Sequence, residues 1–152
     1  MIIYSFILFS KSKIDRMKNR IEFLHSCVEF FTNAKKMVVM YKTSVYDLYQ
    51  AYCEQQQHEL SDMLRCNLIN GLSAMIEMIN QKIELKSEKE LLTDFFINFG
   101  KTVASLQVAQ LDDIIAQIET IISSATEKYT ATKALYYKLS VLIGIGGSVL
   151  LW

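Results

Sequence analysis

The C-terminal third of the chain, residues 100–152, carries an apolar stripe that nothing in the sequence interrupts. It contains no proline, and after Gly100 no glycine occurs before Gly144. Apolar or small residues recur there in alternating steps of three and four, at Val108, Leu111, Ile115, Ile118, Ile122, Ala125, Tyr129, Thr132, Tyr136, Leu139 and Ile143. Such spacing is typical of a helix that packs along one seam, as in a coiled coil. We therefore predict one continuous helix from Gly100 to Trp152.

The end of this helix carries no charge from Leu139 to Trp152. Counted from Ala134, with the Lys138 amine reaching the headgroups, the segment measures about 28 Å, close to the roughly 30 Å of bilayer hydrocarbon. We predict that residues 135–152 form a transmembrane anchor. Its apolar and small residues are Leu139, Val141, Leu142, Ile143, Gly144, Ile145, Val149, Leu150, Leu151 and Trp152. The alternative is a buried C-terminal helix, because apolar runs of this length also occur in soluble cores.

The composition predicts an all-α fold. In 152 residues there are five glycines and no proline, so the punctuation that separates β-strands is nearly absent. A second stripe with steps of three and four runs through Ile14, Met17, Ile21, Leu24, Val28 and Phe31. We expect this helix to lie antiparallel to the C-terminal one in a helical bundle, with several short helices between the two.

The first ten residues form a separate apolar segment, followed by a run of basic residues. Nine apolar or weakly polar residues reach only about 14 Å, too short to span a membrane. Their charges follow the apolar stretch, whereas a signal peptide carries them before it. We interpret residues 1–10 as an interfacial segment or the tail of a longer span that begins outside this chain. The predicted domains are then residues 1–10, a helical bundle over 11–134, and the anchor over 135–152.

Local signals divide the middle of the chain into short helices. Ser44, with Asp47 three residues later, is a capping box that opens one helix. Ser87 with Glu90 is interpreted as a second box. Glycines at 71 and 100 occupy positions where a left-handed residue would end a helix.

Charge and cysteine content limit the partners. The formal net charge is zero, which argues against a nucleic-acid partner, since such binding depends on excess Lys and Arg. The charge is nevertheless uneven, because residues 11–42 hold eight basic and three acidic side chains. Basic flanks beside both apolar ends favour a cytosolic side for the region between them. Three cysteines, an odd number, favour free thiols in a reducing compartment.

None of the candidate chemical motifs is complete, and we predict no enzyme activity, cofactor or small-molecule substrate. Gly100-Lys101-Thr102 resembles the end of a phosphate-binding loop, but it lacks the earlier glycine and the preceding strand. Glycines 144, 146 and 147 lack the strand-turn-helix unit and the downstream acidic residue of a dinucleotide-binding fingerprint. The thiols and imidazoles lack zinc-ligand spacing, so we expect buried thiols, an exposed His58 and no metal. The possible ligands are His25, Cys27, Cys53, His58 and Cys66.

The same residues carry a resemblance to a known family. The order and spacing of Gly100-Lys101-Thr102, Gln107, Leu135-Tyr136, Leu139, Val141-Leu142 and Gly144 are similar to the C-terminal signature of the stage III sporulation protein AB family. Upstream, Tyr41 to Val45 resembles the turn between its first two helices. The chain departs from that pattern at Val45, Val103 and Ser140, where the family has Pro, Asp and Gly.

This resemblance implies a membrane protein of spore-forming bacteria whose helical domain is similar to the cytoplasmic domains of type II secretion platforms. The implied partners are the membrane, a secretion-type ATPase and other proteins of a channel complex between mother cell and forespore. We expect a non-enzymatic platform in the mother-cell membrane, with the corner at Gly100, Lys101 and Gln107 contacting a partner. The alternative is a soluble helical adaptor or chaperone that dimerises through its apolar C-terminal helix.

Overall fold

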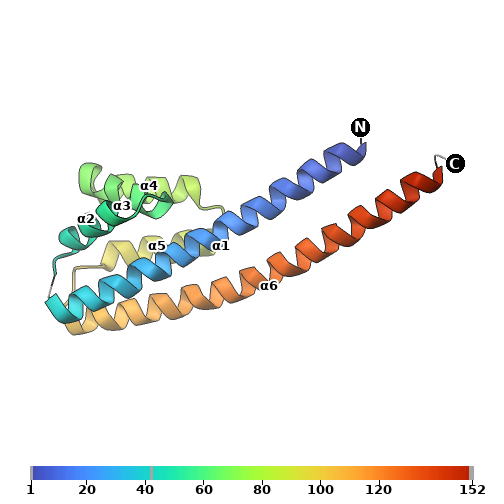
Figure 1. Ribbon diagram of the computed structural model, residues 1–152. Helices are drawn as coiled ribbons and strands as arrows, with labels where there is room; N and C mark the ends of the chain where they lie inside the picture. Colours follow the sequence, from blue (N-terminus) through green and yellow to red (C-terminus); the bar gives the residue numbers. More distant parts are fainter. Residues whose placement is uncertain (1, 42, 151–152) are drawn as a thin grey trace. The chain divides into compact units, whose positions relative to one another are not determined.

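The structure is a computed structural model, which describes the backbone of residues 2–41 and 43–150 and the side chains of residues 8–41 and 43–143. Within these ranges the chain forms six α-helices and no strand, which confirms the predicted all-α class. The long helices are α1 (Ile2–Tyr41) and α6 (Ala104–Leu150), at the two ends of the chain. The short ones are α2 (Val45–Gln55), α3 (Glu59–Asn70), α4 (Leu72–Lys82) and α5 (Lys86–Asn98) (Figure 1).

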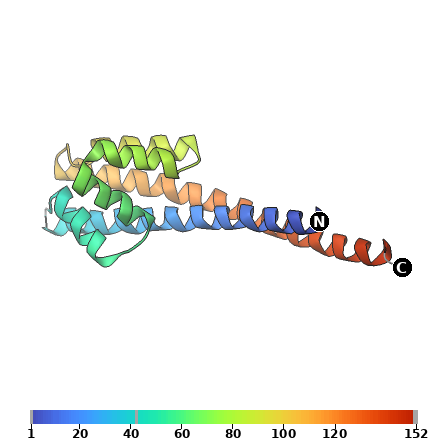
Figure 2. The same ribbon diagram turned by 90° about the horizontal axis from the view of Figure 1, so that it is seen from above.

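The chain divides into two compact units, and both long helices contribute to each. Unit 1 consists of residues 1–25 and 120–152, and unit 2 of residues 26–119. Within unit 2, α2 to α5 lie beside segments of α1 and α6, and each short helix packs against the next (Figures 1 and 2). The predicted domain limits at residues 10 and 134 differ from this division and stay a prediction about membrane-bound segments.

Aromatic side chains form the centre of unit 2. Phe31 of α1 contacts Phe95 of α5 edge to face, with 4.6 Å between the ring centroids, and Phe30 lies 5.0 Å from the Tyr52 ring of α2. Tyr49 and Phe96 join α2 to α5 with centroids 6.3 Å apart. Because large rings bury much apolar area and favour such tilted contacts, they orient α1, α2 and α5 around one core.

Unit 1 consists of two antiparallel helical segments that pack along one seam. On α6 the stripe residues from Tyr129 to Ile143 are half-buried, whereas every other described side chain of that stretch is exposed. On α1 the predicted stripe residues Ile14, Met17 and Ile21 are half-buried and Leu24 is buried, while Arg20 and Phe23 beside the stripe are also half-buried. The 3–4 spacing therefore identified the packing face of both long helices.

The predicted membrane anchor is only partly within the described residues. Leu139 to Ile143 are described with side chains, Gly144 to Leu150 as helical backbone, and Leu151 and Trp152 lie outside the described residues. Among the residues that the structure describes, no helix combines the length and apolarity needed to cross a membrane. The uninterrupted helix is confirmed from Ala104 to Leu150, while the anchor stays a prediction.

One of the two predicted capping boxes is wrong. Ser44 caps α2, since its Oγ accepts the Asp47 N–H at 3.2 Å. Ser87, by contrast, lies inside α5, whose N-cap is Leu85 without a side-chain cap. The neighbouring Glu88 is buried, and Lys89 donates its Nζ to the Asn80 carbonyl at 2.6 Å. These contacts with the rest of unit 2 accompany an earlier start of α5 than the local motif predicts.

Candidate functional site

The candidate site is one end of unit 2, where α1 ends, α2 begins and α5 leads into α6. We call this region the tip and define it as residues 37–46 and 99–107, of which Lys42 lies outside the described residues. Thr43 joins the first connection to α1, because its Oγ1 donates to the Met37 carbonyl at 3.4 Å. Gly100 and Val45 are so close that a Cβ on Gly100 would lie 2.6 Å from Val45 Cγ2. The two connections are therefore in contact.

The connection between α5 and α6 is a tight corner with internal hydrogen bonds. Gly100 has a φ of 85°, in the left-handed region that favours glycine. Gln107 donates its Nε2 to the Thr102 carbonyl at 2.8 Å. Because this bond links the first turns of α6 to the loop before it, Gln107 holds the corner in shape.

The three predicted contact residues differ in what they offer to a partner. Gly100 and Lys101 are exposed, while Gln107 is half-buried and its amide nitrogen is used within the chain. The bond from Gln107 to the Thr102 carbonyl gives this residue a role within the corner. Contact of any of the three with a partner stays a prediction.

The tip also presents large apolar side chains to solvent. Six of them are 49% to 73% exposed, namely Val39, Met40, Tyr41, Tyr46, Val103 and Leu106. Single exposed apolar residues are ordinary, but several gathered at one end of a unit are typical of a protein-interaction surface. Tyr and Met are moreover enriched at such interfaces.

Sequence reasoning missed these six side chains. The helical period identifies residues of the core, and these six side chains lie outside the core. The available signal was the reverse: Val39, Met40 and Tyr41 are three consecutive apolar residues, and a helix cannot turn all three towards one core. A surplus of apolar residues at a helix end was therefore the sequence signal for the tip.

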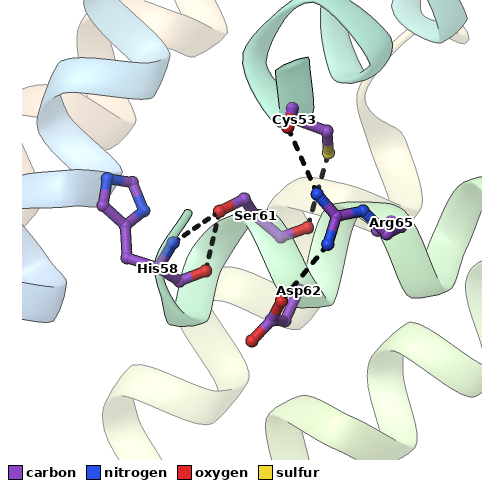
Figure 3. Close-up of polar contacts among 5 residues, drawn as sticks. All are labelled: Cys53, His58, Ser61, Asp62 and Arg65. Carbon is purple, nitrogen blue, oxygen red and sulfur yellow. Dashed lines mark hydrogen bonds and ion pairs between the residues drawn. The ribbon is translucent and has the colours of Figure 1, made fainter. Parts of the chain in front are cut away.

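Apart from the tip, a cluster of polar contacts lies around the connection between α2 and α3 (Figure 3). Ser61 Oγ accepts the His58 N–H at 2.8 Å and donates to the His58 carbonyl at 2.7 Å. Arg65 donates to the Cys53 carbonyl at 3.2 Å and pairs with Asp62 at 3.6 Å. These bonds fix the end of α2 to the first turns of α3.

This cluster has the residue types of a nucleophilic site but not its geometry. The Cys53 thiol donates to the Ser61 carbonyl at 3.4 Å, and burial raises its pKa, so the unreactive protonated form is favoured. The His58 ring points away from Cys53 (Figure 3) and lies 5.8 Å from the Tyr52 ring. His58 was expected to be exposed, which is wrong: it is half-buried, because it packs on Tyr52 at the start of α3.

The other possible zinc ligands lie in different surroundings. Cys27 is fully buried, Cys66 is half-buried and His25 is exposed. Among the side chains that the structure describes, no three of the His, Cys, Asp or Glu type are placed to hold a metal ion.

The fold and the tip together define a small all-α protein that exposes apolar side chains where its helices turn. Comparison with protein families gives a more specific result. The family model for stage III sporulation protein AB matches residues 1–152, the whole chain, and the chain belongs to that family. This family is one of sporulation proteins and not a known enzyme family, so the match indicates a sporulation-related role. Neither the comparison with curated proteins nor that with solved structures returned a match.

Proposed function

We propose that this protein is a non-enzymatic, membrane-anchored platform in a secretion-like channel complex of sporulation, and that it docks a cytosolic secretion-type ATPase. The observation that carries this proposal is the presence of exposed large apolar side chains in two places. One group is at the tip of unit 2, and the other is near the chain's ends in unit 1. A platform requires two such surfaces, one for a protein partner and one for a membrane.

The apolar surface of unit 1 supports the proposal that this unit is anchored in a membrane. Leu8 and Phe9 of α1 are exposed, as are Leu135, Val141 and Leu142 of α6. All five lie off the seam by which the two helices pack, so the pairing leaves them uncovered. In water such side chains are unfavourable, whereas in lipid their transfer is favourable by about 25 cal/mol per Å².

The composition of the tip supports the proposal that a protein docks there. Its six exposed apolar side chains come from α1, α2 and the corner before α6, and Lys101 adds a positive charge beside them. An apolar centre with a polar rim is the usual composition of a protein-protein interface. The family resemblance makes a secretion-type ATPase the partner that we propose for this surface.

Affinity capture of the intact complex from sporulating cells tests the docking. We expect the ATPase to copurify with the unaltered protein and to be lost with Met40→Ser, which removes an apolar side chain from the tip. Ile69→Ser is the matched control, because Ile69 is equally exposed but lies on α3. Equal capture by both variants would show that the tip is not the docking surface.

Gln107→Ala tests the corner in the same assay. Loss of the bond to Thr102 should loosen the start of α6 and weaken ATPase capture, whereas Gln117→Ala, which removes only a bond to Asp113 on one helix, should not. Unchanged capture with Gln107→Ala would remove this residue from the proposal.

The second candidate is a soluble adaptor that dimerises through the apolar end of α6. The exposed side chains of unit 1 would fit a second copy of the chain as well as lipid. Fractionation separates the two functions, because an anchored platform stays in the membrane pellet after a carbonate wash and an adaptor is released. Release, together with a dimer in solution, would favour the adaptor.

A further inference from the structure

The zero net charge of the chain conceals two units of opposite sign. Unit 1 holds eight basic and three acidic residues, a net charge of +5. Unit 2 holds eight basic and thirteen acidic residues, a net charge of −5. The division by spatial contact thus coincides with a division by charge, and this was not visible in the predicted domains.

The positive charge of unit 1 borders its apolar surface on both helices. Lys11 and Lys13 are exposed on α1 and lie two and four residues after the exposed Phe9. On α6, exposed Lys138 lies three residues before exposed Val141. Within unit 1 the start of α1 and the end of α6 lie at the same end (Figure 1), so both helices change from lysine to exposed apolar residues in the same direction.

Two further lysines extend this border along α6. Lys128 and Lys133 are exposed, and the Lys133 amine lies 5.9 Å from the centre of the Tyr129 ring, one turn earlier. We call Lys11, Lys13, Lys128, Lys133 and Lys138 the lysine collar. Lysine beside an apolar surface can keep its alkyl stem along the apolar part while its amine reaches the water or the headgroups.

We propose that the lysine collar binds the headgroups of anionic phospholipids at the membrane that the apolar ends of unit 1 enter. Charge complementarity identifies this partner, because exposed apolar residues bounded by lysines match a bilayer with a negative surface. The same negative surface repels unit 2, so lipid charge favours unit 1, and not the tip, as the membrane-bound part. This inference rests on the membrane anchor of the proposed function.

Vesicle flotation of the full chain tests the collar. The probes are vesicles of phosphatidylcholine alone and of phosphatidylcholine mixed with phosphatidylglycerol, each at low and high salt. We expect stronger binding to the mixed vesicles, with the difference reduced by salt because Debye screening weakens surface attraction. Neutralising two collar lysines, as Lys11→Gln with Lys133→Gln, should weaken binding to the mixed vesicles by roughly 25-fold, since each lysine near an anionic surface contributes about fivefold.

The matched control is Lys36→Gln with Lys86→Gln, which removes the same charge from exposed positions of unit 2 outside the tip and should leave vesicle binding unchanged or slightly stronger. Equal losses in the two double variants would overturn the collar, as would equal binding of the unaltered chain to both kinds of vesicle. Such equal binding would leave the apolar anchor intact. Binding to neither vesicle, with helicity retained by circular dichroism, would instead overturn the anchor itself.

Discussion

Cys27 is a fully buried thiol beside the aromatic core of unit 2. Burial raises its pKa well above the ordinary value of 9.0, and the nearby carboxylates of Glu88 and Glu59 raise it further. A low dielectric disfavours the thiolate, and negative neighbours add to that effect. At neutral pH this residue acts as a small hydrophobic side chain, which explains why a cysteine is tolerated in the core.

The raised pKa of Cys27 predicts a loss of stability in alkali. The folded state retains the thiol proton, while the unfolded chain releases it above pH 9.0. The free energy of unfolding therefore keeps its full value below that pH and decreases as the pH rises above it. We expect Cys27→Ala to be less stable at neutral pH but to lose about 1.4 kcal/mol less between about pH 8 and pH 10. Urea unfolding at both pH values measures this, and equal pH dependence of the two proteins would contradict it.

At the scale of the element, a few backbone positions determine where one helix ends and the next begins. Gly71 and Gly100 both adopt a positive φ, of 87° and 85°. Only Gly100 also has a close neighbour, since Val45 occupies the space that a Cβ would need, whereas nothing lies within 4 Å at Gly71. A side chain at Gly71 would therefore meet backbone strain alone, whereas one at Gly100 would meet both backbone strain and a steric clash.

Alanine at these two glycines should give unequal losses. At Gly71 the positive φ alone should reduce the free energy of unfolding by about 1–2 kcal/mol. At Gly100 the clash with Val45 should add roughly 1–3 kcal/mol. Chemical denaturation measures both, and adding Val45→Ala should recover part of the loss at Gly100 by removing the clash. Equal losses would mean that the corner moves to accommodate the methyl group.

Val103 leaves the start of α6 without a side-chain cap. Its carbonyl accepts the N–H groups of Leu106 and Gln107, each at 3.0 Å, which places it at the N-cap. A valine side chain cannot accept the next free N–H groups. We expect Val103→Asp to raise the thermal midpoint, with a gain of about 0.5–2 kcal/mol.

Val39→Asp is the control for this gain. Val39 is similarly exposed but lies in the last turn of α1, where a negative charge opposes the helix dipole. It should lower the thermal midpoint slightly. If both aspartates had the same effect, the gain at Val103 could not be attributed to capping.

At the scale of the molecule, each long helix passes from one kind of environment to another. On α6 the residues Leu111, Ile114 and Ile118 are buried within unit 2. Beyond Ala125 no described side chain of α6 is buried, and the seam residues are at most half-covered. A helix that contacts one partner along a seam has fewer stabilising contacts than one enclosed on several sides.

This difference predicts a gradient of hydrogen exchange along α6. Amides of residues 111–119 should exchange at least about tenfold more slowly than those of residues 126–134, because opening the former disrupts the core of unit 2. The same gradient is expected on α1, from residues 26–34 to residues 11–20. Mass spectrometry of the intact chain in detergent measures it, and uniform protection along both helices would contradict it.

The sequence alone determined the all-α class, the seam of each long helix and the caps at Ser44 and Gly100. Periodicity and turn residues act over a few positions, so a local pattern is enough to predict them. Only the tertiary structure decided where α5 begins, how His58 packs and which apolar residues remain exposed at the tip. Those properties depend on contacts between different helices, such as Lys89 with Asn80 and His58 with Tyr52, and the pattern within one helix contains no information about them.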